Sequence, residues 1–251
     1  MLTLSILRYS FSHLWALALL FLIWQAYVTI QDFNSIVLPS PTRVFGSIFF
    51  ELDIYAAKTW KTLWVSILGL LLGSFIGAAF AILGWVSVVA SGMVSISAIV
   101  VRSVPIVVFV PILAAMMGYT TTMVITLVAL MSFFPSFVMV SSGLSSLPPA
   151  AHDVAQVYGA TKLRKLLYIA LPASLPNLLA SIRLSASRAI LATMVAEFLT
   201  GIDGLGTLFL LARADLDSEV ALGAALVAAA AALALYYVAD IIETSIVERL
   251  S

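Results

Sequence analysis

The sequence contains no cysteine and only two histidines, His13 and His152. The absence of cysteine excludes disulfides, thiolate metal ligands and cysteine nucleophiles. Two histidines far apart in the chain offer no histidine-rich metal cluster. A G-x-x-x-x-G-K-[ST] loop is also absent, so the chain is not expected to bind ATP in that manner. We therefore expect no metal site, no bound cofactor and no catalytic residues.

Charged residues are scarce. They make up 10% of the 251 residues, whereas 63% are hydrophobic, and the mean hydropathy is +1.16. Soluble globular proteins are usually about a quarter charged, so a chain of this composition is expected to lie in lipid. Twelve basic residues balance twelve acidic ones, which leaves no basic face for nucleic acid.

Six apolar segments approach or exceed the roughly 20 residues that a helix needs to cross a membrane. They cover about residues 14–30, 62–85, 93–117, 120–142, 177–199 and 221–247. They lack the period-two alternation of barrel strands. We predict an all-α, polytopic membrane protein with about six transmembrane helices, forming a single domain over residues 1–251. The first segment superficially resembles a signal peptide, but no Ala-x-Ala-like site follows it, so we expect it to be retained.

Three of the predicted spans contain glycine or proline residues at positions that affect helix packing or helix geometry. The second span carries three glycines at spacing four, Gly69, Gly73 and Gly77. This spacing predicts a face on which another helix packs closely. Pro105, Pro111 and Pro135 each remove a backbone donor and are expected to kink or break their helices. Broken helices often line transport routes, and an ordinary packing kink is the alternative.

The distribution of basic residues predicts the orientation. Six spans place both termini on the same side as the loop over residues 143–176. That side holds five Lys and Arg residues outside the spans and the other side holds four. The positive-inside rule therefore favours a cytoplasmic location for both termini. Within the loop, Lys162, Arg164 and Lys165 are expected to pair with acidic groups of a partner or with lipid headgroups.

The 143–176 loop carries the most specific motif in the chain. It reads Asp153-Val154-Ala155, then three residues, Gly159, nine residues, and Ile169-Ala170-Leu171-Pro172. This pattern resembles the "EAA" loop of ABC importer permeases, with Asp153 in place of Glu and Val154 in place of the first Ala. The resemblance implies that the loop docks a separate cytoplasmic ATPase. The implied coupling residues are Asp153, Val154, Ala155, Tyr158, Gly159, Ala160, Thr161, Ile169, Leu171 and Pro172.

Elementary rules predict the local structure of this loop. Pro148 and Pro149 favour the start of a helix, and Pro172 is expected to end the next one, which gives two short helices joined at Gly159 and Ala160. Asp153 is expected in the first turn, where its charge suits the helix dipole.

Further motifs extend the resemblance over about residues 35–215 to the permeases of aliphatic-sulfonate, taurine and nitrate importers. The matching segments are Leu38-Pro39-Ser40-Pro41, Phe133-Phe134-Pro135, Ile182-Arg183-Leu184, Ala196-Glu197-Phe198 and Gly204-Leu205-Gly206. The family implies a type I importer permease fold in a bacterial inner membrane. It also implies a second permease copy, an extracytoplasmic binding protein, and an ATPase dimer that binds ATP and Mg²⁺ on its own chains. The implied substrate is a sulfonate, taurine or nitrate, and the alternatives are a thiamine precursor, riboflavin or an aromatic acid.

Charged groups inside the spans are candidates for the translocation pathway, because an ionisable side chain in a membrane is costly. Arg183 and Arg188 lie five residues apart, about 140° around a helix, so they need not share a face. An inward-facing arginine would offer an anion a forked set of donors. The candidate pathway residues are Arg102, Pro105, Arg183, Ser187, Arg188 and Glu197. The alternative is structural, with Arg183 near a helix end and Glu197 neutralising an arginine.

The role of one acidic segment and two alternative protein classes remain to be considered. The acidic residues Asp203, Asp215, Asp217 and Glu219 are either a solvated face or a dock for a binding protein. A membrane-embedded enzyme is one alternative class, and the lack of a coherent acid–base set argues against it. An ion-coupled secondary transporter or channel is another, and it would have no need of a coupling loop.

Overall fold

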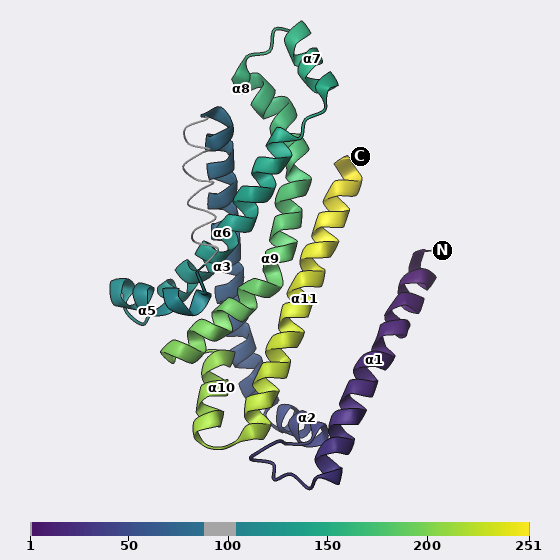
Figure 1. The fold of residues 1–251 in the computed structure, drawn as a ribbon, viewed down its shortest axis with the longest axis vertical. Coiled ribbons are helices and arrows are strands. Elements are labelled where there is room, and N and C mark those ends of the chain that lie inside the picture. The colour runs from purple at the N-terminus through teal and green to yellow at the C-terminus, as the bar shows by residue number, and fades with distance from the viewer. Residues whose placement is uncertain (1, 88–103, 251) are drawn as a thin grey trace.

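The computed structural model describes residues 2–87 and 104–250, and these residues are helical with no β-strand among them (Figure 1). This confirms the all-α prediction. The elements in chain order are α1 (Leu2–Ile30), α2 (Pro41–Phe50), α3 (Leu52–Val86), α5 (Ile106–Met117), α6 (Thr121–Ser145), α7 (Pro149–Val157), α8 (Lys162–Lys165), a π-helical turn (Leu166–Ala170), α9 (Leu171–Thr200), α10 (Leu205–Ala214) and α11 (Ser218–Leu250).

Four helices are long and apolar enough to cross a membrane: α3, α6, the continuous helix over Lys162–Thr200, and α11. They contain the predicted spans 62–85, 120–142, 177–199 and 221–247. The predicted first span falls within α1, whose apolar stretch Ala18–Ile30 is shorter. Of the predicted span 93–117, α5 accounts for residues 106–117, and residues 88–103 lie outside the described part of the chain.

Helices α3, α6 and α9 pack against one another and form the centre of the fold. The glycine face of α3 meets α6 so closely that a Cβ on Gly73 would lie 2.1 Å from the carbonyl oxygen of Ala129. Two hydroxyl pairs join the buried faces: Ser66 with Thr193 at 2.8 Å and Ser136 with Ser181 at 2.9 Å. Close approach of small residues and interhelical hydrogen bonds stabilise helix packing where lipid supplies no hydrophobic driving force.

The three prolines differ in their effect on the helices. Helix α5 begins directly after Pro105, so the predicted break is present there. Helices α5 and α6 continue through Pro111 and Pro135, so neither of these prolines breaks its helix, and a kink at these positions stays a prediction. A proline inside a helix removes one hydrogen bond, and packing against neighbouring helices keeps the remainder of the helix intact.

The predicted end of a helix before Pro172 is wrong. Helix α8 passes through the π-helical turn directly into α9, where Pro172 occupies the first turn. Proline is tolerated in a first turn, and the wider π-helical turn before it gives room for its ring. The second short helix of the loop is therefore the end of a long membrane helix.

The ends of the molecule differ. Figure 1 shows α7 and α8 at one end, with α2 and α10 at the other. Both α1 and α11 run between the two ends, and the N- and C-terminal ends of these helices point toward the end that carries α7. The arrangement places the chain termini on the same side as the 143–176 loop.

Candidate functional site

Helix α7 ends at Gly159 in a Schellman motif. The Gly159 amide donates to the Gln156 carbonyl at 3.0 Å, and the Ala160 amide donates to the Ala155 carbonyl at 2.8 Å. Gly159 has a φ of 59°, in the left-handed region that favours glycine at this position. A Cβ there would meet no atom within 4 Å, so the position requires glycine for its backbone conformation and not for space.

Large apolar side chains are exposed around this turn, at the end of the molecule that carries α7 and α8 (Figure 1). Val157 and Tyr158 are each 83% exposed, Leu163 is 63% exposed and Tyr168 is 79% exposed. Exposed apolar groups gathered in one place mark interaction surfaces. We call Val157, Tyr158 and Leu163 the apolar tip. Of these three residues, only Tyr158 is among the predicted coupling residues, although apolar residues between the charges of the 143–176 loop were an available signal for the other two.

The other predicted coupling residues are divided between surface and interior. Asp153 and Pro172 are exposed, Ala155 is buried, and Ala160, Ile169 and Leu171 are half-buried. Thr161 is exposed, and its hydroxyl accepts the Arg164 amide at 3.3 Å, which caps α8. Val154 lies in α7. Asp153 is the fifth residue of α7 and not in its first turn, so the expected dipole contact is wrong.

Lys162 contacts its own chain, and its pairing with a partner or with headgroups stays a prediction. Its Nζ donates to the Val86 carbonyl at 2.7 Å and lies 5.6 Å from the centre of the Trp85 ring. The indole Nε1 of Trp85 in turn donates to the Leu144 carbonyl at 3.1 Å. The 143–176 loop is thus attached to the end of α3, which is itself joined to the end of α6.

The two arginines of α9 have different surroundings. Arg183 Nη1 lies 2.7 Å from Asp240 Oδ1, and its Nε lies 2.8 Å from Glu243 Oε2, without hydrogen-bond alignment in the second contact. Both acids belong to α11. Arg188 is exposed and forms no ion pair or hydrogen bond within the described residues. The ion pairs therefore favour the structural alternative for Arg183.

Glu197 is buried, with 1% of its surface exposed, and it binds the start of α10. Its carboxylate accepts the Thr62 hydroxyl at 2.9 Å and the Gly206 amide at 2.9 Å. The Thr62 hydroxyl also accepts the Leu205 amide at 2.9 Å. The first amides of a helix lack partners within the helix and carry partial positive charge, so a carboxylate is stabilised there. These contacts favour a structural role for Glu197, with a helix end and not an arginine as its partner.

The same contacts explain the Gly-Leu-Gly motif. A Cβ on Gly204 would lie 2.1 Å from Glu197 Oε1, and a Cβ on Gly206 would lie 2.2 Å from the Met194 carbonyl oxygen. The Ala-Glu and Gly-Leu-Gly motifs therefore form one packed unit. Thr62, which completes the unit, was missed because it lies 135 residues from Glu197 in the sequence.

Some of the acidic residues in the segment 203–219 form ion pairs or hydrogen bonds. Asp203 forms ion pairs with Lys58 and Lys61 of α3, and the hydrogen bonds from Lys58 and then Lys61 hold the pKa of Asp203 below its ordinary value. Glu219 lies 3.6 Å from Arg43, and Asp217 accepts the Val220 amide at 3.0 Å at the start of α11. Asp215 is exposed.

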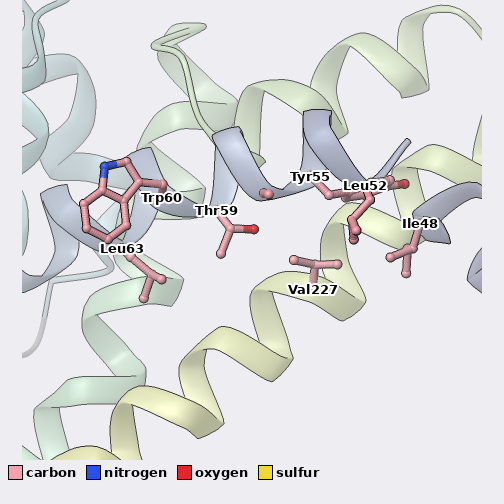
Figure 2. A pocket seen from close by; sticks show the side chains of 8 residues that line it. Ile48, Leu52, Tyr55, Thr59, Trp60, Leu63 and Val227 are labelled. Carbon is pink, nitrogen blue, oxygen red and sulfur yellow. The ribbon is translucent and has the colours of Figure 1, made fainter. Parts of the chain in front are cut away.

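Of the remaining pathway candidates, Pro105 is exposed, Ser187 is half-buried on α9, and Arg102 lies outside the described residues. A cavity of about 360 Å³ lies elsewhere, between α2, α3 and α11 (Figure 2). Its lining is mostly apolar, and no candidate site residue lies in it. The lining residues are Ile48, Leu52, Tyr55, Ala56, Thr59, Trp60, Leu63 and Val227.

Residues 69–251 match the family described as "Binding-protein-dependent transport system inner membrane component". The chain belongs to this family. Its description names an inner-membrane part of a transport system that depends on a binding protein. The membrane-embedded permease that the loop motif indicated is thereby confirmed.

Curated relatives agree with this assignment. A probable ABC transporter permease protein of Haemophilus influenzae is 30% identical over 88% of this chain and 90% of its own. A riboflavin transport system permease protein of Chloroflexus aurantiacus is 27% identical over 92% and 87%. A taurine transport system permease protein of Escherichia coli is 25% identical over 82% and 78%. The permease role is common to these relatives, whereas their named substrates differ.

Solved structures show the fold. A chain of an amino acid ABC transporter superposes with a TM-score of 0.68, covering 80% of this chain and 98% of that one at 16% identity. The fold is that of a type I ABC importer permease.

Proposed function

We propose that this chain is the membrane-spanning subunit of an ATP-driven importer, that it docks a separate cytoplasmic ATPase through the 143–176 loop, and that it imports a small anion. The whole chain acts as one permease domain, and it works beside a second, identical copy. ATP and Mg²⁺ are bound by the ATPase chains and not by this one.

The apolar tip is the observation that carries the ATPase dock. Val157, Tyr158 and Leu163 lie in or beside a turn fixed by the Gly159 Schellman motif, at the end of the molecule that carries α7 and α8. A rigid turn that presents exposed apolar side chains suits insertion into a groove of a protein partner. Asp153, exposed on the same short helix, adds a charge that pairs with basic groups of that partner.

The continuity of α8 with α9 supports a mechanism. When the ATPases close on ATP, the docked tips move with them. The helix over Lys162–Thr200 carries this movement into the membrane without an intervening loop. Alternating access follows if the two permease copies tilt against each other and open the path to one side at a time.

The substrate class rests on Arg188. Arg183 faces two carboxylates, so its charge is offset within the chain. Arg188 lies near the middle of α9, is exposed, and has no ionic partner within the described residues. A positive group at membrane depth is costly unless it faces a polar cavity or a ligand, and a fixed cation offsets the desolvation of an anion. A sulfonate, taurine or nitrate fits this site.

Riboflavin or a related heterocycle is the second candidate substrate. It is favoured by the riboflavin transport permease, which matches 92% of this chain. An arginine can stack on a flat aromatic ring as well as bind an anion, so Arg188 accommodates this candidate.

The proposal also includes the orientation of the chain in the membrane. With the tip in the cytoplasm, both termini are cytoplasmic in a bacterial inner membrane. Helices α2 and α10 then face outward, where an extracytoplasmic binding protein delivers the substrate.

The test of the dock uses Tyr158→Arg, with Tyr158→Phe as the matched control. Tagged permease is purified from its native host, and an ATPase carrying a G-x-x-x-x-G-K-[ST] loop is expected to accompany the wild type and Tyr158→Phe. Tyr158→Arg is expected to lose it, because a charge cannot enter an apolar groove without a partner. Full recovery of the ATPase with Tyr158→Arg, or its absence from the wild type, would contradict the proposal.

The test of the substrate measures uptake by Arg188→Gln in the reconstituted importer, with Arg213→Gln as the control. Arg213 is an exposed arginine on α10. Uptake is expected to fall in Arg188→Gln and not in Arg213→Gln, while the complex stays assembled. Normal uptake in Arg188→Gln, or a binding protein that prefers cations, refutes the anion assignment.

A further inference from the structure

Three segments meet at Trp85, the penultimate residue of α3. The side chain of Trp85 donates to the carbonyl of Leu144 near the end of α6. Lys162 of the coupling loop donates to the carbonyl of Val86 and lies over the Trp85 ring. The ends of α3 and α6 and the start of α8 are therefore joined by two side chains.

Helix-end electrostatics explains why these contacts form. The last carbonyls of a helix have no partner within the helix and carry partial negative charge. The Lys162 ammonium is stabilised at such a carbonyl on α3, and the indole N–H satisfies another on α6. A cation over the face of a tryptophan adds further attraction.

The position of Lys162 within its own helix favours the same explanation. Lys162 is the first residue of α8, where a positive charge is unfavourable because the start of a helix is itself positive. The contact that offsets this effect lies 76 residues earlier in the chain, at Val86. Apolar packing reinforces the attachment. Trp85 packs against a cluster that includes Leu144 of α6 and Leu166 and Ala170 of the π-helical turn.

We propose that Trp85 and Lys162 form a joint that transmits movement of the docked loop to α3 and α6. The inference rests on the proposed docking of an ATPase. Movement of the loop reaches α9 through the continuous helix, and the joint adds a second route to the other two helices at the centre of the fold. Trp85 and Lys162 are positioning residues: they keep the three helices moving together and touch neither ATP nor substrate.

The experiment measures the number of ATP molecules hydrolysed per substrate molecule imported, in proteoliposomes that hold the permease, its ATPase and its binding protein. Lys162→Met removes the cation and Trp85→Leu removes the ring and its donor. In both variants the ATPase is expected to stay bound and active while import falls, so the ratio rises by about fivefold, the effect of losing one such contact in a two-state equilibrium. A role in folding alone would lower yield and activity together and leave this ratio unchanged.

Additional variants test the contact itself. Lys162→Arg keeps the cation and is expected to retain the wild-type ratio, and Trp85→Phe keeps the ring and is expected to give an intermediate one. The double variant Trp85→Leu with Lys162→Met is expected to be no worse than either single variant, because both remove the same coupling. Trp64→Leu is the matched control: Trp64 lies on α3 and is 54% exposed, and its replacement is expected to leave the ratio unchanged.

Other results overturn the proposal. An unchanged ratio in Lys162→Met and Trp85→Leu, with the complex assembled, shows that the joint does not transmit movement. Loss of the ATPase from Lys162→Met alone shows that Lys162 binds the partner and not α3. If the wild-type permease retains no ATPase, the proposed dock has failed, and the joint, which rests on it, is overturned as well.

Discussion

The carboxylate of Glu197 occupies the space that a side chain at Gly204 would need, since a Cβ there would lie 2.1 Å from Glu197 Oε1. This relationship joins the end of α9 to the start of α10. It sets two chemical requirements: a carboxylate at position 197 and no side chain at position 204.

Replacement of this carboxylate is expected to destabilise the protein. Glu197→Ala leaves the buried Thr62 hydroxyl and the Gly206 amide without their acceptor. A buried polar group without a partner costs about 1–3 kcal/mol. We expect a clearly lower midpoint of thermal unfolding in detergent, and a smaller loss for Glu197→Gln, which retains an acceptor oxygen. Asp215→Ala, at an exposed acid nearby in the sequence, is the control, and an equal loss in both variants would contradict this explanation.

The pairs of Asp203 predict a dependence on pH. The pKa of Asp203 is lowered by hydrogen bonds from Lys58 and Lys61, so the folded state favours the charged form. The pairs therefore stabilise the protein above the ordinary pKa of aspartate, about 3.9, and this stability is lost as the pH falls through the lowered value. The difference in unfolding midpoint between wild type and Asp203→Asn should be present at pH 7 and disappear on acidification. It should be small, because these groups are partly exposed. A difference that grows as the pH falls would refute the sign.

Arg183 is expected to affect stability more than transport. Arg183→Met leaves Asp240 and Glu243 facing each other without a cation. Removal of one partner from a partly buried ion pair is expected to cost roughly 1–3 kcal/mol. The double variant Arg183→Met with Asp240→Asn should recover part of that loss. Unfolding midpoints of the three proteins test this, and a stable Arg183→Met with defective uptake would return Arg183 to the pathway.

The effect of a substitution at Gly159 is expected to depend on how well the new residue adopts the backbone conformation, and not on the size of its side chain. Its φ of 59° lies in the left-handed region, and its Cβ position is open. A residue other than glycine costs roughly 1–2 kcal/mol in this conformation, and asparagine costs less. Gly159→Asn should therefore retain more ATPase in purified complexes than Gly159→Ala does. The reverse order would show that the partner contacts this position directly.

Labelling tests the orientation, and the absence of native cysteine makes it simple. Single substitutions Thr161→Cys and Ser251→Cys should react with an impermeant thiol reagent only from the cytoplasmic side. Ser40→Cys and Asp215→Cys should react only from outside. Opposite sides for Thr161→Cys and Ser251→Cys would contradict the six-span arrangement.

The sequence predicted features that depend on local pattern. Apolar length placed the four long helices, glycine spacing predicted a close helix contact on α3 without its partner, and the loop motif placed the turn at Gly159. Features that depend on distant partners were not predictable. The contact of Glu197 with Thr62 and that of Lys162 with Val86 join residues 135 and 76 positions apart. A charge in the sequence does not reveal which helix end lies nearby.

The effect of Pro172 was also not predictable from the sequence. Its expected effect was to end a helix, and the π-helical turn over Leu166–Ala170 absorbs that effect. Proline rules describe a regular α-helix, whereas one wider turn changes which carbonyl the ring would meet.

The π-helical turn also changes the periodicity of the continuous helix over Lys162–Thr200. A π-helical turn closes its hydrogen bonds over one residue more than an α-helical turn, so residues before Leu166 and after Ala170 do not follow a single count of 3.6 residues per turn. Deletion of one residue between Leu166 and Ala170 would restore a regular α-helix, in which the Pro172 ring would clash with the carbonyl four residues before it. The helix would then be expected to kink between the apolar tip and the packed face of α9.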